Sequence, residues 1–317
     1  MKILIQILKG GLLALLFSCS PPRQESVSAS VDPDFKELDD AYYAYVIGDW
    51  GRKGEYRQKE LAGIMGAAAR VVEPEFIAST GDNFYPDGVG SIQDPNWKYS
   101  FEDIYDDFSL NCDWYVTLGN HDYRGNVEAQ IEYTGVSRRW NMPDRYYHKD
   151  VTTDQGASVR FLFIDTNPLN DEYYEREKYK PYVTGQDTVK QLVWMDSLLS
   201  DDYDYKIVIG HHPIYSGGKR SDEMNFVKKH INPLLKKHEV ALYIAGHEHD
   251  LQHIKLEDES THHIISGAGS EIRPTGTIKS TLFSRSVQGF LVMAIQKEKI
   301  QLQFMDVNGK IIYHTSI

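Results

Sequence analysis

Residues 76–85 read Phe-Ile-Ala-Ser-Thr-Gly-Asp-Asn-Phe-Tyr, and they join a short apolar run to a cluster of polar side chains. The apolar run predicts a buried strand over residues 76–79. The turn that Gly81 favours then places Asp82 and Tyr85 just beyond the end of this strand. A phenolate is a hard anionic ligand that favours ferric iron over softer or less charged ions. The segment therefore predicts a strand of a sheet and part of a metal site at its carboxyl end.

The same arrangement recurs at four other places in the chain, where an apolar run ends in a short polar motif that begins with glycine. The motifs are Gly48-Asp49-Trp50-Gly51, Gly119-Asn120-His121-Asp122, Gly210-His211-His212-Pro213 and Gly246-His247-Glu248-His249. Any one of them alone is better explained as a turn, a helix cap or a buried histidine. Together with residues 81–85 they supply two aspartates, a tyrosine, an asparagine and three histidines, which two metal ions can share. Two metal ions bridged by a carboxylate are a common device for splitting phosphate esters.

Helix-like segments alternate with these strands as far as residue 250. Amphipathic periodicity predicts helices over residues 56–71, 97–108, 188–199 and 222–237. Strands are predicted over residues 43–47, 76–79, 114–118, 159–164, 206–209 and 241–245, and later near 262–265, 289–295, 300–305 and 310–313. Such alternation predicts a layered α/β fold, in which ligands bind beyond the carboxyl ends of the strands. We expect one catalytic domain over residues 41–317, because a division into two domains would split the set of motifs.

The composition restricts the partners of this domain. A hydrophobic content of 41% in 317 residues is enough for a sizeable core. The net charge of −12 argues against nucleic acid as a partner, since binding to its backbone needs a basic surface. Small phosphate esters stay compatible with this charge, because a dinuclear metal centre attracts them locally.

The N-terminus predicts export. Residues 3–17 form an apolar stretch too short to span a bilayer comfortably, and residues 16–19 (Leu-Phe-Ser-Cys) resemble a bacterial lipobox. We expect residues 1–19 to be a lipoprotein-type signal peptide and residues 20–40 to be a flexible tether. A plain signal peptide is the alternative. Membrane contact is then expected only through a lipid on Cys19, in the periplasm or on the outer membrane if the source is bacterial, and the protein is otherwise secreted. If Cys19 carries lipid, Cys112 has no partner for a disulfide and is expected to be a buried or idle thiol.

The motifs resemble those of the purple acid phosphatases within the calcineurin-like metallophosphoesterases, most closely the small tartrate-resistant type. The likeness extends to other segments and covers Ala44 to the C-terminus. These segments are Trp114-Tyr115-Val116, Gly125-Asn126-Val127, Arg139-Trp140-Asn141 and Ser266-Gly267-Ala268-Gly269. The resemblance implies a layered β-sandwich of mixed sheets flanked by helices, with a dinuclear metal site at the carboxyl ends of the strands.

The resemblance also implies which residues bind each ion. The ferric ion would be held by Asp49, Asp82, Tyr85 and His249. The divalent ion, which is iron, zinc or manganese, would be held by Asp82, Asn120, His211 and His247. Asp82 is then the bridge. His247 and His249 lie only two residues apart, but a tight turn after Gly246 can aim one at each metal.

The expected mechanism is attack of a metal-bound hydroxide on phosphorus, with the ions neutralising charge on the phosphoryl oxygens. His121 is the candidate for binding phosphate or protonating the leaving alcohol, with an orienting role as the alternative. Asp122 is expected to orient a neighbouring histidine or to cap the turn, and His212 is a third catalytic candidate of open role. His253, His262 and His263 are expected to be structural. The segment 167–184 corresponds either to an exposed loop that limits access to the site or to a solvated loop.

The predicted function is thus that of an exported, monomeric acid phosphatase acting on phosphate monoesters. A phosphodiesterase or a nucleotidase on the same scaffold is the first alternative. An inactive, membrane-tethered binding protein is the second.

Overall fold

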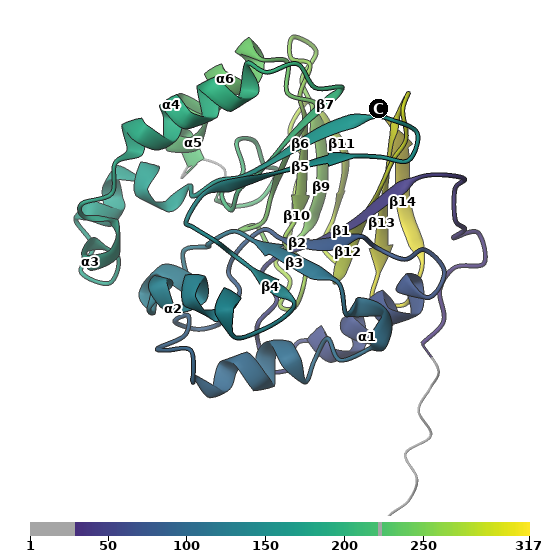
Figure 1. Ribbon diagram of the computed structural model, residues 1–317, viewed down its shortest axis with the longest axis horizontal. Coiled ribbons are helices and arrows are strands. Elements are labelled where there is room, and N and C mark those ends of the chain that lie inside the picture. Colours follow the sequence, from purple (N-terminus) through teal and green to yellow (C-terminus); the bar gives the residue numbers. More distant parts are fainter. Residues whose placement is uncertain (1–28, 221–223) are drawn as a thin grey trace, which may run out of the picture.

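Two seven-stranded sheets lie face to face in the computed structural model, which describes residues 29–220 and 224–317 (Figure 1). The first sheet has the order β14 (Ile311–Ser316), β13 (Ile300–Asp306), β12 (Gly289–Ile295), β1 (Tyr42–Ile47), β2 (Phe76–Ser79), β3 (Asp113–Val116) and β4 (Trp140–Asn141). The second has the order β11 (Thr281–Arg285), β9 (Leu251–Lys255), β10 (His262–Ser266), β8 (Leu242–Ala245), β7 (Tyr205–Ile209), β6 (Ser158–Phe163) and β5 (Tyr147–Thr152).

Both sheets are mixed. In the first sheet β1 to β4 run parallel, and β12 to β14 add to them antiparallel. In the second sheet β6, β7, β8 and β10 run parallel, and β5, β9 and β11 pair antiparallel at the two sides. The prediction of a layered sandwich of mixed sheets is therefore confirmed.

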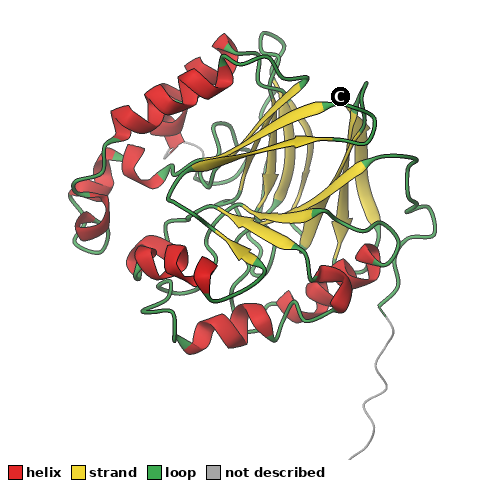
Figure 2. Ribbon diagram, in the orientation of Figure 1, coloured by secondary structure: helices red, strands yellow, loops and turns green. Residues whose placement is uncertain are grey.

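Helices cover the outer faces of the sandwich, as Figure 2 shows. The helices are α1 (Gln58–Ala69), α2 (Val127–Glu132), α3 (Lys180–Val183), α4 (Thr188–Leu199), α5 (Asn225–His230) and α6 (Asn232–Lys237). Helices α4, α5 and α6 pack on the outer face of the second sheet, where Met195, Val227 and Leu235 share an apolar cluster with Val208 of β7. No helix in the described ranges is both long and apolar enough to cross a membrane.

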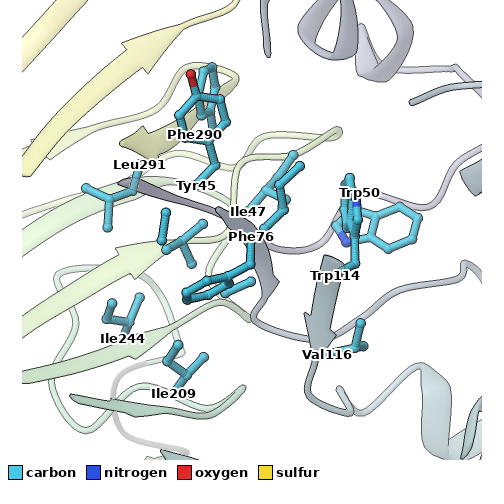
Figure 3. Close-up of a cluster of buried hydrophobic side chains, with 14 of the residues drawn as sticks. Tyr45, Ile47, Trp50, Phe76, Trp114, Val116, Ile209, Ile244, Phe290 and Leu291 are labelled. Carbon is cyan, nitrogen blue, oxygen red and sulfur yellow. The ribbon is translucent and has the colours of Figure 1, made fainter. Parts of the chain in front are cut away.

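The main core fills the space between the sheets. Ile207 and Ile209 of β7 belong to this inner core, whereas Val208 between them faces the helices, because successive side chains of a strand point to opposite faces. Across the sandwich, the rings of Phe76 in β2 and Phe161 in β6 lie 5.1 Å apart between centroids. Figure 3 shows this packing around Phe76, together with Trp50 and Trp114 at one end of the cluster.

The elements differ from the sequence prediction in several places. The helix predicted over residues 97–108 is a short π-helix, Trp97–Glu102, followed by a 3₁₀ turn at Phe108–Leu110. The helix predicted over 222–237 is broken into α5 and α6, because Pro233 at the start of α6 has no N–H to continue the α5 ladder. The four strands β4, β5, β9 and β11 were not predicted.

The domain also begins earlier than residue 41. The signal peptide, Cys19 and residues 20–28 of the predicted tether lie outside the described residues. Residues 29–40 are described, and Phe35 among them is only 4% exposed within the main core. The backbone N–H of Asp32 donates to the carbonyl of Gly309 at 2.7 Å. The prediction of a flexible tether is wrong for this second half, because a buried aromatic ring and a backbone hydrogen bond fasten it to the sandwich.

Candidate metal centre

The five glycine motifs meet at one end of the sandwich. Each follows a parallel strand, namely β1, β2, β3, β7 or β8, and such strands deliver their carboxyl ends to the same edge. All seven predicted ligands are at most 4% exposed; they are Asp49, Asp82, Tyr85, Asn120, His211, His247 and His249. The sequence prediction that these side chains converge is confirmed.

Three of the seven surround the phenolic oxygen of a fourth, Tyr85. This Oη lies 3.0 Å from Oδ1 of Asp49, 2.9 Å from Oδ2 of Asp82 and 3.1 Å from Nε2 of His249. Nε2 of His249 is also 3.4 Å from Oδ1 of Asp49. A phenol has one proton, so it can donate to only one of these three acceptors at a time. The two carboxylates thus face each other across a single donor, and a cation among the four atoms would relieve this shortage.

The other donors gather on the far side of Asp82. Nε2 of His211 lies 3.3 Å from Oδ1 of Asn120 and 3.5 Å from Oδ1 of Asp82, and it is 3.2 Å from Nδ1 of His247. Asp82 therefore presents Oδ2 to the first group and Oδ1 to the second, so its carboxylate lies between the two groups and can bridge them. Nδ1 of His211 is held 2.9 Å from the carbonyl oxygen of Thr80, which keeps its proton there and leaves a lone pair on Nε2.

The electrostatics of the cluster also suit metal ions. Burial lowers the pKa of His211 and His247, and it lowers that of His249 to about 2, so these imidazoles are neutral and able to ligate. Burial, followed by the charge of Asp82, raises the pKa of Asp49 well above its usual range. Burial and both carboxylates likewise raise the pKa of Tyr85. A bound cation reverses such upward shifts, because it favours the anionic form of each oxygen ligand. The donor set therefore fits two metal ions.

The backbone is strained at three of these positions. Asp49, Asp82 and His247 have φ angles of 57°, 51° and 67°, a left-handed region that costs about 1–2 kcal/mol for residues with a Cβ. Such strain gathers at functional sites, where the surrounding structure enforces it. The same turn requires glycine at position 246, since a Cβ there would lie 2.5 Å from Oδ2 of Asp49.

His121 lies at the rim of the cluster. Its Nε2 is 4.0 Å from Oδ2 of Asp82, and its Nδ1 is 2.5 Å from the carbonyl oxygen of Pro86 and 2.9 Å from Nη1 of Arg124. Its side chain is 15% exposed, so solvent can reach it, whereas the predicted ligands are buried. Burial lowers its pKa, against the opposing pull of Asp82.

Asp122 is fully buried and holds two loops together. Its carboxylate accepts from the backbone N–H groups of Gly119, Asn83 and Phe84, and from the side-chain amide of Gln130. Burial and the charge of Asp82 raise its pKa to about 7, while these hydrogen bonds oppose the shift. Of the two roles expected from the sequence, capping the turn is the one that these contacts support.

His212 is buried beside the cluster, and one of its nitrogens lies within 4.8 Å of ligand atoms of His211 and His247. Both of its ring nitrogens have other partners. Nδ1 is 2.7 Å from Oγ1 of Thr166, and Nε2 is 3.2 Å from Oη of Tyr173. Its contacts are those of a residue that links the second sheet to the segment 167–184.

Several neighbours of the cluster were not predicted from the sequence. The guanidinium of Arg52 lies 3.8 Å from the ring centroid of Tyr85 and pairs with Glu271 at 2.6 Å. Arg124, Tyr179 and Arg220 also reach the cluster. Arg52 directly follows the Gly48 motif and Arg124 lies two residues after the Gly119 motif, but no pattern in the sequence marks any of these four residues as a neighbour of the cluster.

The sequence profile described as "Calcineurin-like phosphoesterase" matches residues 43–251. The chain is 37% identical over 284 residues to "Purple acid phosphatase 17" of Arabidopsis thaliana, covering 84% of this chain and 82% of that protein. It is 32% identical over 292 residues to "Tartrate-resistant acid phosphatase type 5" of Oryctolagus cuniculus, covering 86% and 89%.

Solved structures with similar folds include one presented as "GAP50 the anchor in the inner membrane complex of Plasmodium". It superposes with a TM-score of 0.76 at 28% identity, covering 87% of this chain and 88% of that one. A purple acid phosphatase from yellow lupin seeds has the same fold, with a TM-score of 0.61 at 14% identity over 88% of this chain and 54% of that one.

Proposed function

Since the chain belongs to the purple acid phosphatases of the calcineurin-like phosphoesterase family, we propose that it is a metal-dependent acid phosphatase that hydrolyses phosphate monoesters at a dinuclear centre. The observation that carries this proposal is the meeting of six other buried ligand side chains around Asp82, whose two oxygens face different groups of ligands. Coverage of 82% and 89% of the two relatives by this chain supports the same activity.

The proposed division of ligands follows these contacts. A ferric ion is assigned to the group around the phenol: Asp49, Asp82, Tyr85 and His249. A divalent ion is assigned to the group on the other side: Asp82, Asn120, His211 and His247. The phenolate is the reason for placing iron in the first group, because it is a hard anionic ligand.

Two ions bound here would supply water activation and neutralisation of charge on the phosphoryl group. The residues of the chain have three further tasks. Thr80 fixes the tautomer of His211 through its carbonyl oxygen. Asp122 holds the loops that carry Asp82 and Asn120. His121 binds the phosphate or gives a proton to the leaving alcohol, since it combines exposure with a position 4.0 Å from Asp82.

Metal analysis, a visible spectrum and a phosphatase assay on the purified protein test this proposal. We expect bound iron, a purple colour from charge transfer between tyrosinate and iron, and release of p-nitrophenol from p-nitrophenyl phosphate. Tyr85→Phe should abolish the colour, and Tyr99→Phe is the control, because Tyr99 is 52% exposed and belongs to none of the motifs. If the metal-replete protein hydrolyses no phosphate ester, the proposed phosphatase activity is excluded. A colourless, active protein with zinc or manganese alone would exclude the ferric assignment.

The phosphatase assay also distinguishes the proposed function from two others. Faster release from the bis(p-nitrophenyl) ester than from the monoester would indicate a phosphodiesterase. The likeness to the Plasmodium protein presented as an anchor favours a second candidate, a tethered binding protein without activity. That protein is as fully covered by this chain as the enzymes are, so activity on the monoester is the measurement that decides.

Export and attachment to a membrane belong to the proposal as well. Residues 1–19 are assigned as a lipoprotein-type signal peptide, with lipid on Cys19. In bacterial cells expressing the full chain, radiolabelled palmitate should enter the protein and should be lost in Cys19→Ser. Labelling that survives this substitution would contradict the assignment.

A further inference from the structure

A polar pocket of about 260 Å³ opens beside the candidate metal centre. Asn120 and His247, both assigned to the divalent ion, form part of its lining. Four cationic side chains line it as well: Arg124, Arg176, Lys178 and Arg220. They come from three separate parts of the chain, so the pocket is assembled by the tertiary fold and not by one basic stretch of sequence.

The charge of this pocket is opposite to that of the chain as a whole, which carries −12. Among the residues that the structure describes, the lining contains one carboxylate, that of Glu172, which pairs with Arg176 at 2.5 Å. Asp87 lies outside the lining and is 3.8 Å from Nη1 of Arg124. The cations of the described lining therefore outnumber its carboxylates, and this local excess of positive charge attracts anions to the pocket.

Hydrogen bonds fix part of this positive charge in place. Nε and Nη2 of Arg124 donate to Oη of Tyr179 at 3.1 and 3.0 Å, and the side-chain amide of Asn120 donates to the same oxygen at 3.3 Å. Tyr179 is only 2% exposed, and its ring stacks on that of Tyr173 with centroids 4.1 Å apart. These contacts bring the segment 167–184, and with it Arg176 and Lys178, to the edge of the site.

Arg220 has a separate relation to the centre. Its Nη1 is 3.3 Å from Nε2 of His247. When Nδ1 of His247 binds a metal, Nε2 carries the ring proton and can no longer accept from a guanidinium. Arg220 then has donors available for another acceptor in the pocket.

We propose that this pocket binds a second phosphate group, carried on the leaving-group side of the substrate. The inference rests on the proposed function, since the first phosphate must occupy the neighbouring metal centre. Guanidinium groups match the oxygens of a phosphate with paired, charge-assisted hydrogen bonds. A substrate with one phosphate has no group that uses these cations, whereas a bisphosphate spans both parts of the site. The substrate class is thus a phosphate ester with two or more phosphate groups.

A matched pair of substrates tests this inference: propane-1,3-diol bisphosphate and the corresponding monophosphate. In Arg176→Gln/Lys178→Gln we expect kcat/KM to fall about tenfold for the bisphosphate and less than twofold for the monophosphate. Lys180→Gln is the control, since Lys180 is exposed on the same segment outside the lining. High salt should reduce the preference of the parent protein for the bisphosphate. Equal losses on both substrates, or no loss on these two substrates and none on inorganic pyrophosphate, would overturn the inference.

Inorganic pyrophosphate distinguishes the two forms of the same chemistry. A selective loss on pyrophosphate places the second phosphate directly beside the first, and a selective loss on the propanediol compound places it at a carbon-spaced distance. Either result supports the pocket as a phosphate site. If the double variant shows no selective loss on either compound, the inference is contradicted.

A binding measurement separates failure of the pocket from failure of the proposed activity. Calorimetry on the metal-loaded protein compares propane-1,3-bisphosphonate with methylphosphonate, neither of which is hydrolysed. If no ester is hydrolysed but the bisphosphonate binds more tightly, and the double variant abolishes this difference, the phosphatase proposal fails and the pocket stands. If the monophosphate is hydrolysed normally but the parent protein shows no preference in binding, the phosphatase stands and the pocket inference fails.

Discussion

Replacement of Asp122 by asparagine tests whether one buried carboxylate organises the two loops that carry Asp82 and Asn120. Oδ1 of Asp122 accepts from the N–H groups of Asn83 and Phe84 and from Gln130, at 2.9 to 3.3 Å. Oδ2 accepts from the N–H groups of Gly119 and Asn83 and from the Asn83 amide, at 2.8 to 3.2 Å. Asparagine keeps only one of these oxygens and turns an NH₂ group toward the donors that faced the other.

The expected cost follows from this count. With the new NH₂ group in place of Oδ2, the N–H of Gly119 loses its acceptor and the NH₂ group finds none among the donors that it faces, and each buried donor without a partner costs about 1–3 kcal/mol. After some relaxation we expect the free energy of unfolding to fall by about 2–5 kcal/mol. The loops that move also carry the proposed bridge, so the affinity for metal should fall as well, by about 10- to 100-fold.

Urea unfolding of the metal-free protein measures the first quantity, and zinc titration measures the second. Asp103→Asn is the matched control, because Asp103 is exposed and forms only a long ion pair, with its Oδ2 3.8 Å from Nζ of the exposed Lys98. Its effect should stay below about 0.5 kcal/mol. A loss below this level in Asp122→Asn, with unchanged zinc affinity, would refute the view that the carboxylate positions both loops.

Three other predictions concern residues outside the metal centre. Trp50→Ala should lower the free energy of unfolding by about 3–5 kcal/mol in urea, because this fully buried ring packs edge-on against other aromatic rings; a loss near 1 kcal/mol would contradict such packing. Burial raises the pKa of the Cys112 thiol to about 11, so at pH 8 its reaction with a disulfide reagent should be about a hundredfold slower than that of a free cysteine and should accelerate up to pH 11. The pKa of Glu259 is lowered although burial opposes this, since His263 and Tyr215 hydrogen-bond to the carboxylate. Its contribution is therefore present in full above the unfolded pKa of about 4.3, and it is lost gradually as the pH falls from there through the lower folded pKa. Glu259→Gln should cost about 2 kcal/mol at pH 7 and less at pH 3, and a cost independent of pH would refute the charge argument.

The sequence predicts most of the buried elements of this fold, because their residues report their surroundings directly. Strand β2 consists of three apolar residues and Ser79, with Gly81 two positions later, and its bounds were predicted to the residue. Strand β5 reads Tyr-His-Lys-Asp-Val-Thr and lies at the side of its sheet, where alternate residues face solvent. Its register depends on pairing with β6, which is a long-range contact that no local pattern encodes. Phe35 was missed for the same reason, since one aromatic ring in a polar stretch gives no periodic signal.

The same contrast between local sequence pattern and long-range contact applies to the candidate site. Aspartate, tyrosine and histidine after Gly81 or Gly246 are chemically distinctive, so the sequence nominates them as donors. The cations of the pocket carry no such mark. Arg220 becomes relevant only because the fold sets its guanidinium 3.3 Å from His247, and Arg124 only because Tyr179 folds over it from a distant segment. Their role depends on where loops pack, which composition does not determine.

The geometry of the turn after Gly246 depends both on the local sequence and on contacts made by the fold. The sequence shows His247 and His249 two residues apart, a spacing that in an extended strand would point both rings to the same face. The left-handed φ of 67° at His247 breaks that extension, and the N–H of His247 is tied to Oδ2 of Asp49 at 2.9 Å. Nδ1 of His247 therefore faces His211, while Nε2 of His249 faces Tyr85. The left-handed His247, held by Asp49, thus turns its own ring and that of His249 toward different groups. Loss of Asp49 should therefore disturb both halves of the centre and not only the half that it lines.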